Sequence, residues 1–327
     1  MQLNKAFSIR NDAEFLSLAL ATFRFQYENC AVYRQYTDML HKDIDAIKEL
    51  NDIPFLPIEF FKTQKILANG YPPQLQFTSS GTTSEQTSTH YVADKALYEE
   101  SYRACFNYFV GKPSDFVILA LLPSYLEREH SSLVYMLNGL IHESKHADSG
   151  FYLYNYAAFA EKLNELSAKN QKTLVFGVGF ALLDIVEKYQ FQHSDLWVFE
   201  TGGMKGRRKE ISREELHEKL SKGFGVETIY SEYGMTELLS QAYSLNGESF
   251  RCPPWMKVVL RDAQDPLTLL HSVDKRGGIN VIDLANVYSC SFIATQDLGK
   301  YRRDGSFEVL GRFDYADIRG CNMLVEE

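Results

Sequence analysis

Cysteine is scarce in this sequence, and the few that occur follow no binding pattern. Five cysteines are present among 327 residues, and no two of them have C-x-x-C spacing. An odd, sparse set argues against a disulfide framework and against a structural zinc site, and it fits a reducing cytosol. The cysteines are Cys30, Cys105, Cys252, Cys290 and Cys321.

Long apolar runs are also missing. No stretch reaches the roughly 18–20 residues that a helix needs to cross a bilayer. Residues 1–7 lack the apolar segment of a secretion signal. We therefore expect a cytoplasmic protein that does not insert into membranes.

Positive charge is in deficit. Lysine and arginine total 34 against 43 aspartate and glutamate residues, which gives a formal net charge of −9. A general nucleic-acid binder needs a basic surface to neutralise phosphates, so this balance argues against nucleic acid as a partner. A local site for a smaller anion is still compatible with it.

What the chain does have is a regular alternation of apolar strands and helical stripes from residue 116 onward. This pattern predicts an α/β fold in which layered, mostly parallel sheets carry helices on both faces. The helix over 213–222 has a capping box, from Ser212 to Glu215, and Gly223 is the expected stop. The expected strands are 116–122, 151–154, 173–178, 196–200 and 226–230, and the expected helices are 131–144, 157–169, 181–189 and 213–222.

The flanking regions have a different character. Before residue 116 the pattern predicts helices over 12–50 and 95–108, with an extended crossing over 53–61 that contains Pro54 and Pro57. After about residue 250, short strands separated by turn signals predict a β-rich subdomain. We therefore expect an α/β core over 1–248, including a helical N-terminal segment, and a β-rich subdomain over 249–327. The short strands are expected at 257–261, 268–273, 280–283, 292–295 and 306–310.

The most informative local feature is a run of small and hydroxylated residues around one glycine, which follows an apolar entry at 75–77. Such a loop presents several backbone N–H groups and hydroxyls to one anion, because nothing bulky blocks a close approach. Taken alone, the run is more often a solvated turn. The residues that matter are Thr78, Ser79, Ser80, Gly81, Thr82 and Thr83.

Two other segments also follow directly on predicted strands. These are the glycine pair Gly202–Gly203 and the segment from Tyr233 to Glu237. In open α/β folds, ligands bind beyond the carboxyl ends of the strands. We therefore expect the three segments to meet at one edge of a sheet.

Four segments in this order carry a family resemblance. They read Thr-Ser-Ser-Gly-Thr-Thr at 78–83, Tyr-Gly-Met-Thr-Glu at 233–237, Gln-Asp-Leu-Gly at 296–299 and Gly-Arg-Phe-Asp at 311–314. The chain resembles the adenylate-forming superfamily, which includes acyl-CoA synthetases, nonribosomal adenylation domains and firefly-type luciferases. Segments 123–126, 201–208 and 317–321 are similar to those of a narrower group, the acyl-protein synthetases (luciferin-component ligases) of bacterial bioluminescence operons.

The resemblance implies a role for each matched residue. Activation of a carboxylic acid, expected to be a fatty acid, would use ATP and Mg²⁺. Ser79, Ser80, Gly81, Thr82 and Thr83 would cradle the triphosphate. Thr236 would contact the α-phosphate, and Glu237 would ligate Mg²⁺, a hard ion that prefers oxygen ligands.

The nucleoside would be held by the remaining matched positions. Tyr233 would flank the adenine, and Gly202, Gly203 and Gly234 would allow a close approach of the backbone. Asp297 would accept hydrogen bonds from the ribose hydroxyls, and Arg312 would support the nucleotide from the other side.

Two departures from the family pattern affect the expected mechanism. The phosphate loop usually continues with Gly, Pro and Lys, whereas this chain has Ser-Glu-Gln-Thr-Ser at 84–88, which shifts charge neutralisation towards Mg²⁺ and Lys205, Arg207 or Arg208. Only 13 residues follow Asp314, which matches the family's hinge, so we expect the large domain without the mobile C-terminal domain.

The second departure draws attention to Cys321. In luciferin-component ligases, a cysteine near the C-terminus accepts the acyl group as a thioester and passes it to a partner reductase. Cys321 follows Arg319 and Gly320 in the matching context. A thiolate is a good nucleophile towards an adenylate, although a small buried cysteine at a strand end is an equally good interpretation.

Three alternatives stay open at this point. An acyl-CoA ligase similar to the phenylacetate enzymes would need coenzyme A. A non-catalytic module would hold nucleotide or acyl chain without turnover, as the altered phosphate loop suggests. The sequence from His142 to His146 also fits H-E-x-x-H, a zinc-peptidase pattern that is short and arises by chance, with Glu161 or Glu165 as a conceivable third ligand.

Overall fold

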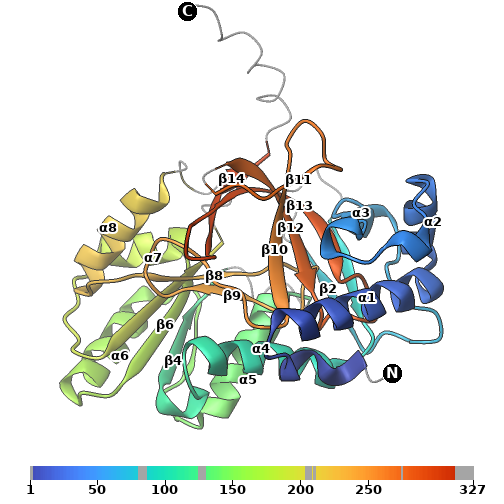
Figure 1. The fold of residues 1–327 in the computed structure, drawn as a ribbon. Helices are drawn as coiled ribbons and strands as arrows, with labels where there is room; N and C mark the ends of the chain where they lie inside the picture. The colour runs from blue at the N-terminus through green and yellow to red at the C-terminus, as the bar shows by residue number, and fades with distance from the viewer. Residues whose placement is uncertain are drawn as a thin grey trace, which may run out of the picture.

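Two six-stranded sheets, one mostly parallel and one mostly antiparallel, determine the architecture of the chain (Figure 1). The computed structural model describes residues 3–79, 87–123, 130–202, 208, 211–273 and 275–313. Within these ranges, every element expected from the α/β pattern is present, and the predicted fold class is confirmed.

The first sheet has the strand order β5-β4-β6-β7-β8-β9. Strands β4 to β8 run parallel, and β9 closes the edge in the antiparallel direction. All side chains of β4 and β6 are buried, as expected for strands that are covered on both faces. The bounds are β4 Val117–Leu121, β5 Gly150–Tyr152, β6 Thr173–Val178, β7 Leu196–Thr201, β8 Tyr230–Tyr233 and β9 Ala242–Ser244.

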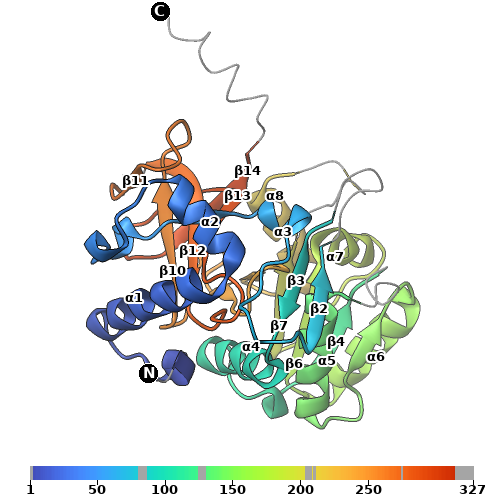
Figure 2. The same ribbon diagram turned by 90° about the vertical axis from the view of Figure 1, so that its right-hand side faces the viewer.

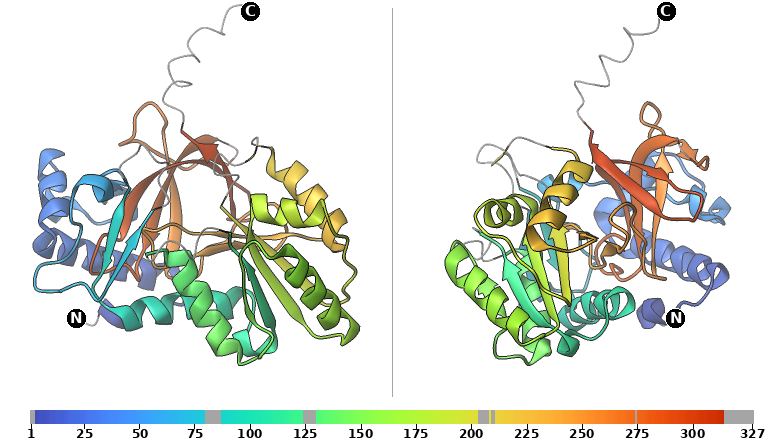
Figure 3. Two further views of the ribbon diagram at one scale, coloured as in Figure 1. Left: turned by 180° about the vertical axis from the view of Figure 1, so that it is seen from behind. Right: turned by 90° about the vertical axis from the view of Figure 1, so that its left-hand side faces the viewer.

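Helices cover both faces of this sheet. The connection from β4 to β5 moves one way across the sheet, and the connections from β5 to β8 move the other way. Right-handed crossovers therefore put α5 on one face and α6, α7 and α8 on the other, as Figures 1 and 3 show. The bounds are α4 Lys95–Phe109, α5 Ser132–Ser144, α6 Tyr156–Ala168, α7 Gly179–Val186 and α8 Arg213–Phe224, with a 3₁₀ turn η4 at Pro113–Asp115.

The ends of α8 test the capping prediction. The Ser212 hydroxyl accepts the N–H of Glu215 at 3.1 Å, so the predicted start is confirmed. The predicted stop at Gly223 is wrong. A Cβ there would lie 2.3 Å from Val186 Cβ, so Gly223 is required for packing of α8 against α7. The helix ends instead at Gly225, which has φ +67°.

The same helix end explains a second shift. The N–H of Val226 bonds to the Ser221 carbonyl at 3.1 Å and so completes the helix terminus. The strand expected over 226–230 therefore begins only at Tyr230. The apolar residues at 226–230 therefore belong mostly to the connection between α8 and β8, which packs against the protein, and not to the strand itself.

The second sheet has the order β1-β13-β12-β10-β11, with β14 also paired to β13. Its pairs are antiparallel except β1 with β13, which brings Leu56 and Pro57 from early in the chain beside Ile293 and Ala294. The bounds are β1 Leu56–Pro57, β10 Met256–Arg261, β11 Leu269–Leu270, β12 Arg276–Asp283, β13 Phe292–Tyr301 and β14 Phe307–Arg312.

The N-terminal region is less continuous than expected. The helical region predicted over 12–50 is interrupted at the buried Cys30, whose backbone is extended, and the prediction is wrong beyond Met39, where α2 ends. The apolar pattern crosses Cys30 unchanged, so the break is not visible in it. The elements are η1 Leu3–Ser8, α1 Asp12–Asn29, α2 Ala31–Met39, η2 Ile44–Ala46, η3 Leu50–Asp52 and α3 Phe60–Thr63. In the described ranges, no helix is long and apolar enough to span a membrane.

A short hairpin completes the fold. Strands β2 (Leu75–Thr78) and β3 (Thr89–Val92) pair with each other and lie beside α3 (Figure 2). The Thr78 N–H also bonds to the His130 carbonyl at 2.9 Å, just before α5. The hairpin therefore carries the ends of the hydroxyl-rich loop to the parallel sheet.

Candidate active site

The carboxyl ends of β7 and β8 bring two of the predicted segments together. Thr201 and Glu232 are paired across these strands, and the Thr201 hydroxyl donates a hydrogen bond to the Glu232 carboxylate. Gly202 follows with φ +59°, a conformation that favours glycine. Gly203 lies outside the described residues.

Gly234, directly after β8, is set by the same carboxylate. A Cβ at this position would lie 2.3 Å from Glu232 Oε1 and 3.3 Å from Gln241 Cγ. A side chain at position 234 would therefore require the Glu232 carboxylate, which bonds Thr201, to move away. This supplies a structural reason for the glycine in the Tyr-Gly-Met-Thr-Glu segment.

The base of the hydroxyl-rich loop is closed by two hydrogen bonds. The Ser79 N–H donates to the Ser88 carbonyl at 3.0 Å, and the Ser88 N–H donates to the Ser79 hydroxyl at 2.9 Å. Ser80, Gly81, Thr82 and Thr83 lie outside the described residues. What the structure shows of this loop is its two ends, held face to face.

Glu237 contacts this hairpin directly. Its side chain is buried, with the residue 5% exposed, and its Oε1 accepts a hydrogen bond from the Ser88 hydroxyl. Burial raises the pKa of Glu237, and the Ser88 hydrogen bond opposes that rise. Two segments that lie about 150 residues apart in the chain are thus in hydrogen-bond contact.

His90, which sequence reasoning did not single out, holds the backbone of the same turn. Its Nδ1 lies 2.8 Å from the Thr236 carbonyl oxygen, and its Nε2 lies 3.1 Å from Asn286 Oδ1. Asn286 Nδ2 in turn donates to the carbonyls of Glu237 at 2.8 Å and Cys290 at 2.9 Å. Complete burial lowers the pKa of His90 to about 4.

Asp283 holds the residues that follow Glu237. This fully buried carboxylate accepts the N–H groups of Leu239 at 2.8 Å, Ser240 at 2.9 Å and Ala285 at 3.1 Å, and the Ser240 hydroxyl at 2.6 Å. Burial raises its pKa, and these donors counter the rise. Asp283 was also missed, because a lone aspartate at a strand end carries no recognisable pattern.

Asp297 and Tyr233 form the other side of the site. The Tyr233 hydroxyl donates to Asp297 Oδ2 at 2.8 Å, and the tyrosine ring packs against both Phe250 and Phe307, which stack on each other. Arg312, paired with Asp297 across β13 and β14, places its Nε 3.7 Å from Asp297 Oδ1. Burial raises the pKa of Asp297, while the Tyr233 hydrogen bond and the Arg312 charge lower it.

The cysteines that the structure describes are poor candidates for an acyl-accepting thiol. Cys30, Cys105 and Cys290 are buried, and burial raises the pKa of each. Burial also raises the pKa of Cys252 to about 12. Cys321 lies outside the described residues, so the prediction made for it stays a prediction.

The basic segment after Gly202 contains one described cation. Arg208 donates to the carboxylates of Asp184 on α7 and of Glu187, which directly follows α7, so its charge is already paired. This pairing argues against Arg208 as the cation that neutralises phosphate charge. Lys205 and Arg207 lie outside the described residues.

The H-E-x-x-H pattern does not form a metal site. Helix α5 ends at Ser144 and Lys145 has φ +58°, so His142 and His146 do not share a helical face. Glu143 pairs with Arg103 at 2.7 Å, and His146 Nε2 contacts the Ser114 carbonyl at 3.0 Å. Across the described ranges, no group of three His, Cys, Asp or Glu residues is placed to hold a metal by itself.

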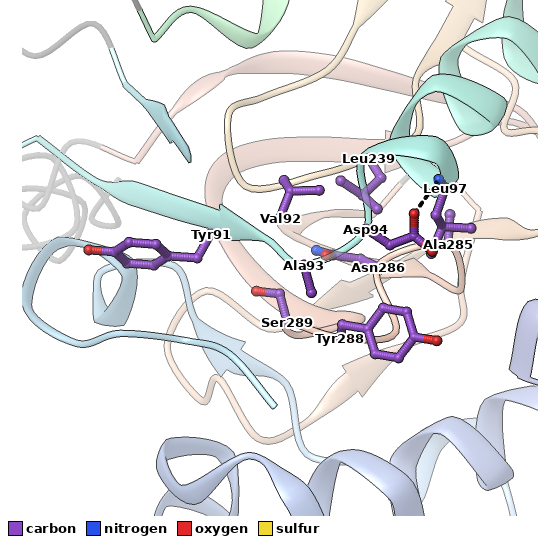
Figure 4. Close-up of a pocket in the computed structure, with 10 residues that line it drawn as sticks. All are labelled: Tyr91, Val92, Ala93, Asp94, Leu97, Leu239, Ala285, Asn286, Tyr288 and Ser289. Carbon is purple, nitrogen blue, oxygen red and sulfur yellow. Dashed lines mark hydrogen bonds between the residues drawn. The ribbon is translucent and has the colours of Figure 1, made fainter. Parts of the chain in front are cut away.

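A small crevice borders the site on its inner side (Figure 4). Residues 91–94, Leu97, Leu239, residues 285–286 and residues 288–289 line it. Its interior of about 10 Å³ has room for about one water molecule. It is too small for a nucleotide or an acyl chain.

Comparisons with known proteins place this geometry in context. No family model matches the sequence. The chain is 22% identical over 335 residues to a long-chain-fatty-acid–luciferin-component ligase of Vibrio harveyi, covering 95% of this chain and 86% of that protein. A ligase of the same name from Photorhabdus luminescens is 42% identical over 66 residues, which is 20% of this chain and 56% of that one.

Among solved structures, a 2-hydroxyisobutyryl-CoA ligase in complex with 2-HIB-AMP and CoA matches with a TM-score of 0.69. The match covers 94% of this chain and 72% of that one, at 12% sequence identity. The chain therefore has the fold of the large domain of adenylate-forming ligases. The resemblance to that superfamily and the similarity to luciferin-component ligases are confirmed.

Proposed function

We propose that this chain is an acid–thiol ligase that works in the cytoplasm. It uses ATP and Mg²⁺ to convert a carboxylic acid, expected to be a fatty acid, into an acyl adenylate, and then transfers the acyl group to a thiol. The observation that carries the proposal is the contact between Glu237 and the hydroxyl-rich hairpin through Ser88. Similarity over 95% of the chain to a long-chain-fatty-acid–luciferin-component ligase supports the substrate class.

The described residues fit a magnesium nucleotide better than a free cation. Glu237 offers one buried carboxylate, and the described ranges hold no group of three acidic or histidine residues that would bind a metal alone. Mg²⁺ commonly takes one or two carboxylates together with phosphate oxygens and water. Bound at Glu237, it would neutralise charge on the phosphates of ATP.

The nucleoside side of the site is supplied by Tyr233 and Asp297. Asp297 has one carboxylate oxygen on the Tyr233 hydroxyl and the other facing Arg312, an arrangement that fixes its orientation. We assign the ribose hydroxyls to Asp297 and the adenine to the region of Tyr233, with Gly202 and Gly203 allowing close approach. Thr236, held by its carbonyl, would present its side chain to the α-phosphate.

The proposed reaction has two steps, formation of the acyl adenylate and transfer of the acyl group. A carboxylate oxygen of the acid attacks the α-phosphorus of ATP, and pyrophosphate leaves. A thiolate then attacks the acyl carbonyl, and AMP leaves with the bonding electron pair. Both steps require anions to approach each other. The main contributions of the protein are therefore to hold the reacting groups in position and to neutralise their charge.

We assign the thiol to Cys321. The four described cysteines have their pKa raised by burial, which leaves little thiolate at neutral pH. An acyl group held on Cys321 would pass to a partner, either a reductase or another acceptor protein.

Intact-mass analysis tests this function. The protein is incubated with ATP, Mg²⁺ and a panel of fatty acids of different chain lengths. A mass increase equal to the fatty acid minus one water is expected for the native chain and should disappear in Cys321→Ala, while exchange of pyrophosphate into ATP persists in both. Acyl labelling of Cys321→Ala at the native level would exclude this cysteine.

A second candidate, an acyl-CoA ligase, is favoured by the fold match to 2-hydroxyisobutyryl-CoA ligase. Here the acceptor would be coenzyme A, and product would form only when coenzyme A is added. A binding module without turnover, in contrast, would support pyrophosphate exchange with none of the acids.

A further inference from the structure

The entry to β3 presents two polar side chains on one face. Ser88 and His90 are 2% and 0% exposed, whereas Thr89 and Tyr91 between and after them are only half-buried. This alternation is the period of an extended strand. Ser88 and His90 therefore face the same neighbour, which is the turn that carries Thr236 and Glu237.

Each of the two residues holds a different part of that turn. The Ser88 hydroxyl bonds the carboxylate of Glu237, and the His90 ring contacts the carbonyl of Thr236 at 2.8 Å. Asn286 completes the ring of contacts, because it touches His90 at 3.1 Å and donates to the Glu237 carbonyl at 2.8 Å. Side chain and main chain of the Thr236–Glu237 pair are thus fixed from three directions.

The orientation of Asn286 is itself fixed by a residue far away in the sequence. Gln26 on α1 donates to the carbonyls of Asn286 at 3.0 Å and Val287 at 2.9 Å. The side chains of Gln26 and Asn286 are both buried. These buried hydrogen bonds tie the backbone at Asn286 to α1 and so limit the orientations that the turn can adopt.

We infer that Ser88 and His90 are positioning residues that orient Glu237 towards the magnesium ion of a bound nucleotide. The inference rests on the proposed function and deepens it. The hydrogen bond to Oε1 fixes the plane of the carboxylate, and the carbonyl contact of His90 fixes the backbone from which it extends. Mg²⁺ demands near-ideal octahedral geometry, so its affinity is sensitive to the direction of a ligand.

This role also accounts for the altered phosphate loop. The chain has serine at position 88 and no lysine over 84–88. Charge neutralisation then depends more on the metal, and the metal depends on a well-oriented Glu237. Ser88 gives the Glu237 carboxylate a hydrogen bond from a neutral group, whereas a cationic side chain at this position would compete with Mg²⁺ for that carboxylate.

Calorimetric titration of ATP into the protein, with Mg²⁺ and again with a chelator, tests the inference without measuring turnover. Ser88→Ala should weaken ATP binding about 10- to 100-fold with Mg²⁺, the usual cost of losing a group that orients a metal ligand. Binding of ATP with the chelator should change by less than about twofold. Ser144→Ala is the matched control, because Ser144 is equally buried and its hydroxyl bonds the Ile141 carbonyl, far from Glu237.

Further variants separate positioning from general structural damage. Ser88→Thr keeps the hydroxyl and should restore most of the magnesium-dependent affinity. In a Glu237→Gln background, Ser88→Ala should have little additional effect, because the two residues act on one ligand. His90→Leu should weaken binding in the presence of Mg²⁺, and it provides the same test if Ser88→Ala does not fold.

The outcomes distinguish the two proposals. If the native chain shows no binding of ATP that depends on Mg²⁺, both are overturned. If the native chain shows it and folded Ser88→Ala and His90→Leu match the native affinity, this inference is overturned and the proposed function stands. An equal loss with and without Mg²⁺ would also overturn it, since the effect would then not act through the metal.

Discussion

The parallel sheet and the polar contacts beside it are both buried, but they are held together in different ways. In β4 and β6 the side chains are almost all apolar, and hydrogen bonding is left to the backbone ladder. Beside the sheet, buried polar groups bond one another across distant segments. We call this second group the polar seam, and its members are Gln26, Ser88, His90, Glu237, Asp283 and Asn286.

The difference concerns what each region specifies. Apolar packing is roughly proportional to buried area and tolerates a change of shape when volume is conserved. A hydrogen bond in a buried network depends on direction, and losing one partner leaves the other unsatisfied. We therefore expect substitutions in the sheet to change stability alone, and substitutions in the seam to change stability and nucleotide binding together.

The largest expected loss of stability comes from the sheet. Phe176 is fully buried and stacks on Phe199 with 5.7 Å between ring centroids. Phe176→Ala should lower the free energy of unfolding by about 3–5 kcal/mol, the usual cost of such a cavity. Denaturant titration measures this loss. The folded fraction should bind ATP with the same magnesium-dependent affinity as the native chain. A changed affinity would contradict the expectation that substitutions in the sheet affect stability alone.

The seam should respond with a smaller loss of stability and a larger loss of binding. Asp283→Asn keeps the size of the side chain. It also turns an N–H group towards backbone N–H donors that, in the native chain, bond the carboxylate. We expect a cost of about 3 kcal/mol in unfolding free energy and clearly weakened magnesium-dependent ATP binding. Asp262→Asn, in an exposed turn, is the control and should leave binding unchanged. Native ATP affinity in Asp283→Asn would contradict the role given to the seam.

Two tyrosines, one at the site and one in the core, allow the same comparison with smaller expected losses of stability. Tyr233→Phe removes the 2.8 Å hydrogen bond to Asp297 and should cost about 1 kcal/mol of stability while raising the KM for ATP. The Tyr243 hydroxyl is buried without a hydrogen-bond partner in the part of the chain that the structure describes. Tyr243→Phe should therefore be neutral or slightly stabilising, with the native KM. Thermal unfolding and steady-state kinetics of the two variants settle the point.

The smallest effect concerns pH and lies at the opposite end of the sheet. His193 Nδ1 accepts the Asp195 N–H at 3.2 Å, and Nε2 lies 3.2 Å from the Thr173 hydroxyl. Burial lowers the pKa of His193 below the usual 6.5, so the unfolded chain binds the proton more readily. This contribution to stability is present above about pH 6.5 and is lost as the pH falls below it. His193→Gln should flatten that part of the curve of unfolding free energy against pH; an unchanged slope would show that another group is responsible.

The sequence predicted the sheet well because its strands are local, continuous and apolar. Strand β6 was expected over the same residues that the structure shows, 173–178. Errors arose where tertiary packing decides an end, as at Gly223, which lies inside α8 because only a glycine fits against Val186. The break at Cys30 was missed because the apolar period continues across it.

The site could be predicted only in part, for a related reason. The matched segments predicted roles for Tyr233, Glu237, Asp297 and Arg312, and the structure brings the first and third into a hydrogen bond. Ser88, His90, Asp283 and Asn286 act through contacts with residues far away in the chain, so no local pattern marks them. A signal did exist for Ser88 and His90, since polar residues two apart at a strand entry point to one face.

The most direct test of the central claim is a crystal structure of the protein with ATP, Mg²⁺ and no acid. We expect Mg²⁺ at about 2.0–2.1 Å from an oxygen of Glu237, with the ribose hydroxyls hydrogen-bonded to Asp297 and the Ser88 hydroxyl still hydrogen-bonded to the Glu237 carboxylate. A nucleotide bound elsewhere, or a metal that is not ligated by Glu237, would contradict it.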